Sequence, residues 1–189
     1  MNLKQRSDTF LMEFKQGCML VLGGAKSGKS RYALDICNRS GKNRIFLATA
    51  RAKDQEMKER ILRHQAEREP EWLTREEPLK IAAAIREADR EDTIILVDCL
   101  TLWLSNLFMK YKDDQREIDR AVETLVTQLA DIHGSVVLVS NEVGAGIVPD
   151  NPLSRRYRDC AGLLNQQVAA TADKVVAVIA GIPLALKDA

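Results

Sequence analysis

Residues 23–30 restrict the fold of this chain more than any other segment. They read GGAKSGKS, which matches the spacing GxxxxGK[ST] of a loop whose backbone N–H groups surround phosphate groups. An apolar run at 18–22 precedes the loop, and a helical stretch containing Tyr32, Ala33 and Ile36 follows it. A strand, a glycine-rich turn and a helix in this order predict a nucleoside triphosphate site. The alternative is a glycine-rich turn that binds nothing.

Two side chains of this loop have defined roles when a triphosphate is bound. Lys29 is placed to reach the β and γ oxygens, and Ser30 is placed to ligate Mg²⁺. We therefore predict that Lys29 is catalytic and that Ser30 is a metal ligand. The predicted nucleotide-binding segment consists of Gly23, Gly24, Ala25, Lys26, Ser27, Gly28, Lys29 and Ser30.

Short apolar runs rich in β-branched residues alternate with segments of helical spacing. The clearest helical face is residues 118–132, in which every third or fourth residue is apolar. This alternation predicts an α/β fold with a mostly parallel central sheet and helices on both faces. In such sheets ligands bind at the carboxyl ends of the strands. The candidate strands are residues 18–22, 45–48, 93–97, 135–140 and 174–179.

Asp98 directly follows the apolar run at 93–97. A carboxylate at the end of a strand near the phosphate loop is the usual second partner of Mg²⁺, so we predict Asp98 as a metal ligand and nucleotide contact. The alternative is a helix-capping aspartate, because a helix can start near Thr101. Thr49 and Asn141 follow two other candidate strands, where a substrate would bind.

Residues 54–68 read DQEMKERILRHQAER, lack Gly and Pro, and predict a charged amphipathic helix. Arg60, His64 and Arg68 are four residues apart and share one face of it. Two cations beside an imidazole favour its neutral, nucleophilic form and also bind phosphate, which suits covalent phosphorus chemistry. The more common meaning of such a face is a solvated surface in which the histidine is incidental. We expect the other histidine, His133, to end a helix and to favour its dipole.

The composition argues against several classes of partner. Lys and Arg number 28 against 27 Asp and Glu, so the net charge of +1 does not favour nucleic acid as the main partner. No charge-free apolar run has membrane length, so we expect no stable membrane insertion. The four cysteines lack zinc spacing and suggest buried thiols in a cytoplasmic protein. We expect one catalytic domain at 18–189 and assign no role to the N-terminal extension at 1–17.

The chain resembles the bifunctional adenosylcobinamide kinase and adenosylcobinamide-phosphate guanylyltransferase family of cobalamin biosynthesis. The resemblance runs from about Met19 to Lys187, and its most specific combination is RIxxHxxxR followed by NEVGxGIVP. The segments that carry it are GGAKSGKS, ATARAKDQEMKERILRHQAER at 48–68, the strand ending in Asp98, SNEVGAGIVPDN at 140–151 and DKVVAVIAGIPLALK near the end.

This resemblance implies a P-loop NTPase of the RecA-like type and two reactions in one site region. Adenosylcobinamide is phosphorylated with ATP or GTP as the donor. GMP is then transferred from GTP to adenosylcobinamide phosphate through a GMP-histidine intermediate, giving adenosylcobinamide-GDP and pyrophosphate. Carried over, His64 is that histidine, and the family also implies a homo-oligomer, specifically a trimer. Besides the phosphate loop, the implied nucleotide contacts are Ala48, Thr49, Ala50, Gln65, Ala66, Glu67, Arg68, Glu76 and Asp98.

Two features depart from the family pattern. Asp98 stands where some members have Glu, and Pro70 lies one place later than the family's Arg-Pro pair. The nearest rival interpretation is a small-molecule kinase without a covalent guanylyl step, in which Arg60 and Arg68 clamp phosphates as a lid does. Another is a regulatory nucleotide-binding module whose hydrolysis drives the binding of a partner.

Overall fold

A computed structural model of the chain describes residues 14–50, 70–112 and 114–188. In these residues helices and strands alternate along the chain for most of its length. The elements are β1 (Gly17–Gly23), α2 (Lys29–Arg39), β2 (Asn43–Ala48), β3 (Leu73–Glu76), α4 (Ile81–Ala88), β4 (Thr93–Asp98), α5 (Leu100–Tyr111), α6 (Gln115–Leu129), β5 (Ser135–Asn141), α7 (Pro152–Thr171), β6 (Lys174–Ile179) and β7 (Ile182–Asp188).

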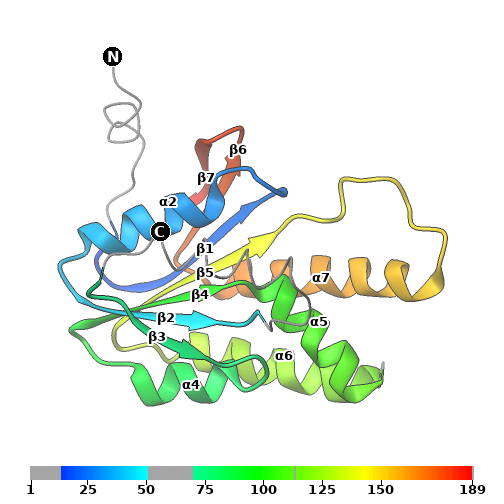
Figure 1. Ribbon diagram of the computed structural model, residues 1–189, viewed down its shortest axis with the longest axis horizontal. Coiled ribbons are helices and arrows are strands. Elements are labelled where there is room, and N and C mark those ends of the chain that lie inside the picture. Colours follow the sequence, from blue (N-terminus) through cyan, green and yellow to red (C-terminus); the bar gives the residue numbers. More distant parts are fainter. Residues whose placement is uncertain (1–13, 51–69, 113, 189) are drawn as a thin grey trace.

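The strands form one sheet in the order β3-β2-β4-β5-β1-β6-β7. All neighbouring pairs are parallel except β6 and β7, which are antiparallel. Figure 1 shows α2 on one face of the sheet and α4, α5, α6 and α7 on the other. The predicted α/β architecture, a mostly parallel sheet with helices on both faces, is therefore confirmed.

The two faces of the sheet bury alternate residues of the same strands. In β1, Cys18 and Leu20 pack with the helices α4 to α7, whereas Met19 and Val21 pack with α2. Successive side chains of a strand point to opposite faces. A central strand that is buried on both faces therefore needs an unbroken apolar run, which is what the sequence has at this point.

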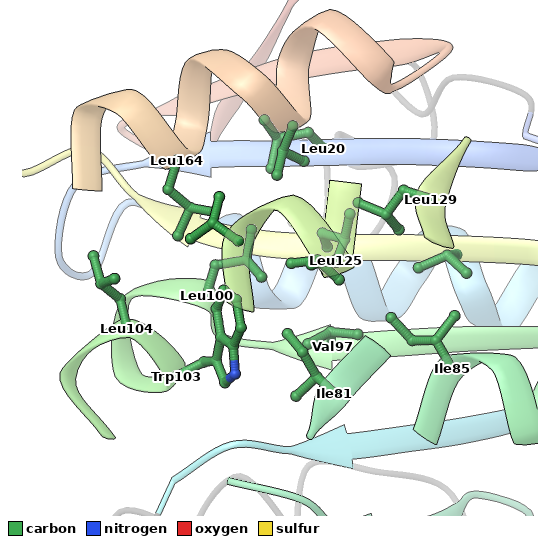
Figure 2. Packing of buried hydrophobic residues seen from close by; sticks show 14 of the residues in the cluster. Leu20, Ile81, Ile85, Val97, Leu100, Trp103, Leu104, Leu125, Leu129 and Leu164 are labelled. Atoms are coloured by element: carbon green, nitrogen blue, oxygen red, sulfur yellow. The ribbon is translucent and has the colours of Figure 1, made fainter. Parts of the chain in front are cut away.

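Helix α6 shows how the predicted apolar face is used. Its residues Ile118, Val122, Leu125 and Leu129 are all buried, and in Figure 2 Leu125 and Leu129 lie among the side chains that fill the space between helix and sheet. The helix begins at an N-cap, Asp114, whose side chain accepts a hydrogen bond from the N–H of Arg116.

The expectation for His133 was wrong. Helix α6 ends at Leu129, so His133 lies in the turn beyond it and not in its last helical turn. Its Nδ1 lies 3.2 Å from Oδ2 of Asp89, and the same carboxylate oxygen accepts the backbone N–H of His133 at 2.9 Å. A carboxylate brought by the end of α4, rather than a helix dipole, is therefore its partner.

Two strands at the edges of the sheet were not predicted. β3 is short and exposed on most of its residues, and β7 is exposed along nearly its whole length. β3 lacks the apolar run by which buried strands are recognised. β7 begins with the apolar run IPLAL at 182–186, but this run follows Gly181 and contains Pro183, residues that favour a turn. The turn between β6 and β7 lies at Ala180 and Gly181, which both have positive φ, and Ile182 and Pro183 belong to β7.

The residues just before the first strand contact the domain. Phe14 is buried in the cluster under α2, the backbone oxygen of Lys15 accepts the hydroxyl of Ser135 at 3.1 Å, and Gln16 donates to the backbone oxygen of His133 at 2.8 Å. The described part of the N-terminal extension is therefore held against the sheet.

The cysteine side chains are free thiols, and three of them, Cys18, Cys37 and Cys99, are buried as expected. Desolvation by burial raises the pKa of Cys18 to about 12, so its thiol stays protonated at neutral pH. Cys160 is only half-buried. In the part of the chain that the structure describes, none of the helices has the length and apolar character needed to cross a membrane.

The packing of α6 gives a stability prediction. Leu125→Ala removes a side chain that is 0% exposed, so we expect the free energy of unfolding to fall by about 3–5 kcal/mol because a cavity remains. Leu163→Ala is the matched control, since Leu163 is 55% exposed on α7, and we expect a loss of about 0.5 kcal/mol. Urea denaturation of both variants measures the difference. Equal losses would contradict this account of the core.

Candidate active site

The phosphate loop joins the end of β1 to the start of α2. Gly28 takes the N-cap position with φ of 97°, a left-handed conformation that favours glycine. Its carbonyl oxygen accepts the N–H of Tyr32 at 2.9 Å, which starts the helix, and the N–H of Ser27 donates to the oxygen of Gly24 at 3.2 Å. The loop is thus a compact turn that ends at a helix N-terminus, where backbone N–H groups favour anions.

Lys29 is folded back over this turn. It is 7% exposed, and its Nζ donates to the oxygen of Gly24 at 3.0 Å. An ammonium group held across the mouth of the loop lies where phosphate oxygens would come. Of the other loop residues, Gly23 is buried, Ser27, Gly28 and Ser30 are half-buried, and Gly24, Ala25 and Lys26 are exposed.

The β6–β7 turn supports the loop from the side. The N–H of Gly181 donates to the backbone oxygen of Ser27 at 2.8 Å. A Cβ atom built on Gly23 would lie 2.6 Å from the backbone oxygen of Val178 and would also collide with the side chain of Ser27. Glycine is therefore required at position 23 because the loop lies directly against β6.

Ser27 carries the clearest sign of a missing partner. Its Oγ is buried and makes no hydrogen bond with any described residue. Buried polar atoms are nearly always paired, so an unpaired one at a proposed ligand site calls for an explanation. A bound phosphate group offers acceptor oxygens beside this hydroxyl.

The carboxyl ends of five strands lie side by side with this loop. The register pairs Ala48 with both Glu76 and Asp98, Asp98 with Val139, and Gly23 with Asn141. The structure therefore places the phosphate loop, Ala48, Glu76 and Asp98 along the edge of the sheet that is formed by the carboxyl ends of its parallel strands. β5 lies between β1 and β4, so Asn141 stands between the loop and Asp98.

The described chain holds only part of the predicted site. Thr49 and Ala50 follow β2 at the same edge, where Thr49 is buried and Ala50 half-buried. Asp98 is half-buried, and the N-cap of α5 is Cys99, so Asp98 is not a helix cap as the alternative required. The predicted residues outside the described part of the chain are His64, Gln65, Ala66, Glu67 and Arg68, together with Arg60.

A buried polar network below this edge was not predicted. Nδ2 of Asn141 donates to Oγ1 of Thr101 at 2.6 Å, and the hydroxyl of Tyr157 donates to the backbone oxygen of Thr101 at 2.7 Å. Asn165 donates to the oxygen of Asn141 at 3.2 Å and accepts the hydroxyl of Ser140 at 2.6 Å. Desolvation raises the pKa of Tyr157, so it remains a neutral donor. The network fixes the end of β5 against α5 and α7.

One sequence signal could have revealed this network. Asn165 lies on the buried face of α7 with Ala161, Leu164 and Val168, at the spacing of an apolar helix face. An amide on such a face needs buried polar partners. The sequence does not say which partners, because Ser140 and Asn141 reach Asn165 only through the packing of α7 on the sheet.

The oxygen atoms at this edge suit a magnesium ion that is bound together with a nucleotide. Ser30 supplies a hydroxyl and Asp98 a carboxylate, which are the hard oxygen donors that Mg²⁺ prefers. Among the described residues, there is no cluster of three or more His, Cys, Asp or Glu side chains that could hold a metal ion with protein ligands alone. Mg²⁺ usually keeps several waters and takes phosphate oxygens as further ligands, so these residues fit it.

Comparison with known proteins adds an independent finding. Residues 19–186 match the model of a family described as cobinamide kinase / cobinamide phosphate guanyltransferase. The bifunctional adenosylcobalamin biosynthesis protein CobP of Pseudomonas aeruginosa is 46% identical over 168 residues, which cover 89% of this chain and 96% of the relative. CobU of Escherichia coli, of the same description, is 35% identical over 180 residues, with 89% and 99% coverage.

Solved structures agree on the fold. A KaiC-like protein from Pyrococcus horikoshii has a TM-score of 0.51 at 13% identity, over 87% of this chain and 72% of its own. An ATPase from a bacterial type III secretion system has a TM-score of 0.52 at 14% identity, over 85% of this chain and 50% of its own. At such low identity the likeness concerns the fold alone, and it agrees with the predicted P-loop NTPase fold.

The tight approach at Gly23 yields a test of the loop. Gly23→Ala forces a Cβ against the backbone of β6, and overpacking of about 1–3 kcal/mol predicts about a 5- to 150-fold loss of GTP affinity. Gly24→Ala meets no atom within 4 Å, so its loss should be far smaller. Isothermal titration calorimetry with GTP measures both. Similar losses would mean that the loop does not depend on its contact with β6.

Proposed function

The chain belongs to the cobinamide kinase / cobinamide phosphate guanyltransferase family, and on that basis we propose how its own residues divide the two reactions. It is a bifunctional enzyme of cobalamin biosynthesis that first phosphorylates a cobinamide and then transfers a guanylyl group to the phosphate. The observation that carries our assignment of residues is that the phosphate loop, Ala48, Glu76 and Asp98 all lie at the carboxyl ends of parallel strands of the sheet.

In the kinase reaction, the aminopropanol hydroxyl of adenosylcobinamide attacks the γ-phosphorus of ATP or GTP. The bond from this phosphorus to the β–γ bridging oxygen breaks, and the nucleoside diphosphate leaves. Lys29 exchanges the oxygen of Gly24 for phosphate oxygens, and the N–H groups of the loop bind the same phosphates. Such a reaction depends on positioning and on charge stabilisation rather than on covalent help from the protein.

We assign Ser30 and Asp98 as the residues that hold Mg²⁺. When bound there, the ion supplies positive charge that neutralises the phosphate oxygens during transfer. The half-buried residues Ser30 and Asp98 support this assignment, since Ser30 lies at the start of α2 in the phosphate loop and Asp98 ends β4 at the same carboxyl end of the sheet.

In the guanylyl reaction, a ring nitrogen of neutral His64 attacks the α-phosphorus of GTP. The bond from the α-phosphorus to the α–β bridging oxygen breaks and pyrophosphate leaves, which makes a phosphoramidate bond to the histidine. A phosphate oxygen of adenosylcobinamide phosphate then attacks the same phosphorus and displaces the histidine. The product is adenosylcobinamide-GDP, and the imidazole is free to react again.

The topology supports a histidine in this part of the chain as the nucleophile. The segment between β2 and β3 leaves the sheet after Ala50, at the edge that carries the phosphate loop, and β3 returns to that edge at Glu76. His64 lies in this segment, at 51–69, which is outside the described residues. The residues that precede this segment therefore lie at the same carboxyl end of the sheet as the phosphate loop.

The role of Lys29 can be tested in both reactions. Lys29→Ala removes the ammonium group beside the phosphates, and we expect both the kinase and the guanylyl rates to fall by about 100-fold or more. Lys110→Ala is the charge-matched control, since Lys110 is exposed on α5. Rates are measured separately with adenosylcobinamide and with its phosphate. Retained kinase activity in Lys29→Ala would show that the phosphate site is elsewhere.

The covalent step has a direct readout. Incubation with GTP labelled at the α-phosphate should give an acid-labile, alkali-stable label on the protein, because phosphoramidate bonds have this stability. His64→Ala should abolish the label, whereas His133→Ala should keep it, since His133 is exposed and contacts Asp89. Equal labelling of wild type and His64→Ala would refute the assignment of His64. No label on any variant would favour a kinase without a covalent step.

A further inference from the structure

Thr49 is fully buried directly beyond β2, and its hydroxyl and its N–H are hydrogen-bonded to the backbone of Asp98 and Cys99. Its hydroxyl donates to the backbone oxygen of Cys99 at 2.8 Å and accepts the N–H of Cys99 at 2.8 Å. Its own N–H donates to the backbone oxygen of Asp98 at 3.2 Å. The side chain is 0% exposed. A hydroxyl has one proton to donate, and that of Thr49 is already used.

These bonds hold the chain at the point where Asp98 leaves the sheet. The β2–β4 ladder ends at the pair Ala48 and Asp98. Thr49 extends the pairing, because its hydroxyl hydrogen-bonds both the N–H and the backbone oxygen of Cys99. Asp98 is therefore held on its N-terminal side by the β2–β4 ladder and on its C-terminal side, at the Asp98–Cys99 peptide group, by Thr49. A backbone held on both sides limits the directions in which its side chain can point.

A second side chain fixes Thr49 in turn. Nδ2 of Asn106, a buried residue of α5, donates to the backbone oxygen of Thr49 at 2.8 Å and to that of Pro78 at 3.1 Å. The chain segments after β2 and after β3 are thus tied to the same helix. The position of Thr49 is set by α5, and the position of Cys99 is set by Thr49.

We propose that Thr49 is a positioning residue for Asp98 and not a side-chain contact of the nucleotide. This inference rests on the proposed role of Asp98 as a magnesium ligand. Mg²⁺ requires ligand oxygens at about 2.0–2.1 Å in nearly octahedral geometry. A carboxylate that moves by about 1 Å loses most of its value to such a site. Three hydrogen bonds from Thr49 to the Asp98–Cys99 segment prevent this movement.

The test separates positioning from direct contact by measuring how strongly the metal tightens nucleotide binding. The dissociation constant of α,β-methylene-GTP is measured by calorimetry in Mg²⁺ and again in EDTA, and the value in EDTA divided by the value in Mg²⁺ is compared between variants. This analogue has no α–β bridging oxygen, so it blocks the proposed guanylyl step, and without cobinamide there is no acceptor for the γ-phosphate. The measurement therefore reports binding alone.

Thr49→Val keeps the shape of the side chain and removes both hydroxyl bonds to Cys99. We expect it to lower the EDTA-to-Mg²⁺ ratio of dissociation constants about tenfold, equivalent to about 1.4 kcal/mol, and to leave the affinity in EDTA within about twofold. Thr49→Ser restores the hydroxyl and should restore most of the ratio. Thr93→Val is the matched control, because Thr93 is a buried threonine at the other end of β4, and its ratio should equal that of wild type.

A crystal structure of Thr49→Val supplies the second readout, in which we expect the carboxylate of Asp98 to be displaced. An equal loss of affinity in EDTA and in Mg²⁺ would show that Thr49 contacts the nucleotide. A ratio equal to that of Thr93→Val with Asp98 unmoved would also overturn the inference. Should Thr49→Val not fold, Thr49→Ala, which leaves room for water beside Cys99, is measured in the same way with the same expectation.

Asp98→Asn separates a failure of this inference from a failure of the proposed metal site. We expect it to lower the ratio at least as far as Thr49→Val does. If Asp98→Asn leaves the ratio at the wild-type value, the metal role of Asp98 is wrong. The structure of Thr49→Val then decides the positioning role, because it reports the place of Asp98 without reference to any metal.

Discussion

The burial of β1 between two parallel neighbours is the constraint on which the site depends. β5 and β6 pair with its two edges, and its residues Met19, Leu20 and Val21 are 0% exposed. Because this strand cannot slide or turn without exposing apolar surface on both faces, its end at Gly23 is fixed in position and direction. The phosphate loop continues from this fixed strand end, and the hydrogen bond from the N–H of Gly181 to the backbone oxygen of Ser27 holds it further.

The buried polar groups beneath the site are held by hydrogen bonds rather than by apolar packing. Thr49, Thr101, Asn141 and Asn165 are buried or half-buried, and in a low-dielectric interior such groups destabilise the fold unless they are paired. Here each one is hydrogen-bonded to a neighbouring strand or helix end. The same bonds that satisfy these groups fix the carboxyl ends of β2, β4 and β5 relative to one another. Stability and the geometry of the site are therefore properties of one network.

In our proposal, one triphosphate site serves two reactions that differ in the phosphorus attacked. The kinase reaction is cleavage at the γ-phosphorus, for which a loop, a lysine and a metal are sufficient. Guanylyl transfer is cleavage at the α-phosphorus, and in our proposal it needs a nucleophile supplied by the segment between β2 and β3. In the sheet, β4 with Asp98 lies between β1, which carries the phosphate loop, and the strands β2 and β3. The segment that joins β2 to β3 therefore starts on the far side of Asp98 from the loop, so the two reactions draw on different parts of the sheet.

The sequence by itself determined the phosphate loop, the central strands and the family, because each depends on local spacing: glycines at fixed positions, unbroken apolar runs, and residues repeated at helical intervals. It did not identify β3, whose exposed residues lack such a pattern, or β7, whose apolar residues include Pro183 and follow a glycine. It also placed Thr49 among the nucleotide contacts, whereas the tertiary structure turns its hydroxyl to Cys99, fifty positions away in the chain. Hydrogen bonds between strand ends join residues that are distant in the chain and arise only when the sheet and α5 pack together, so no local pattern predicts them.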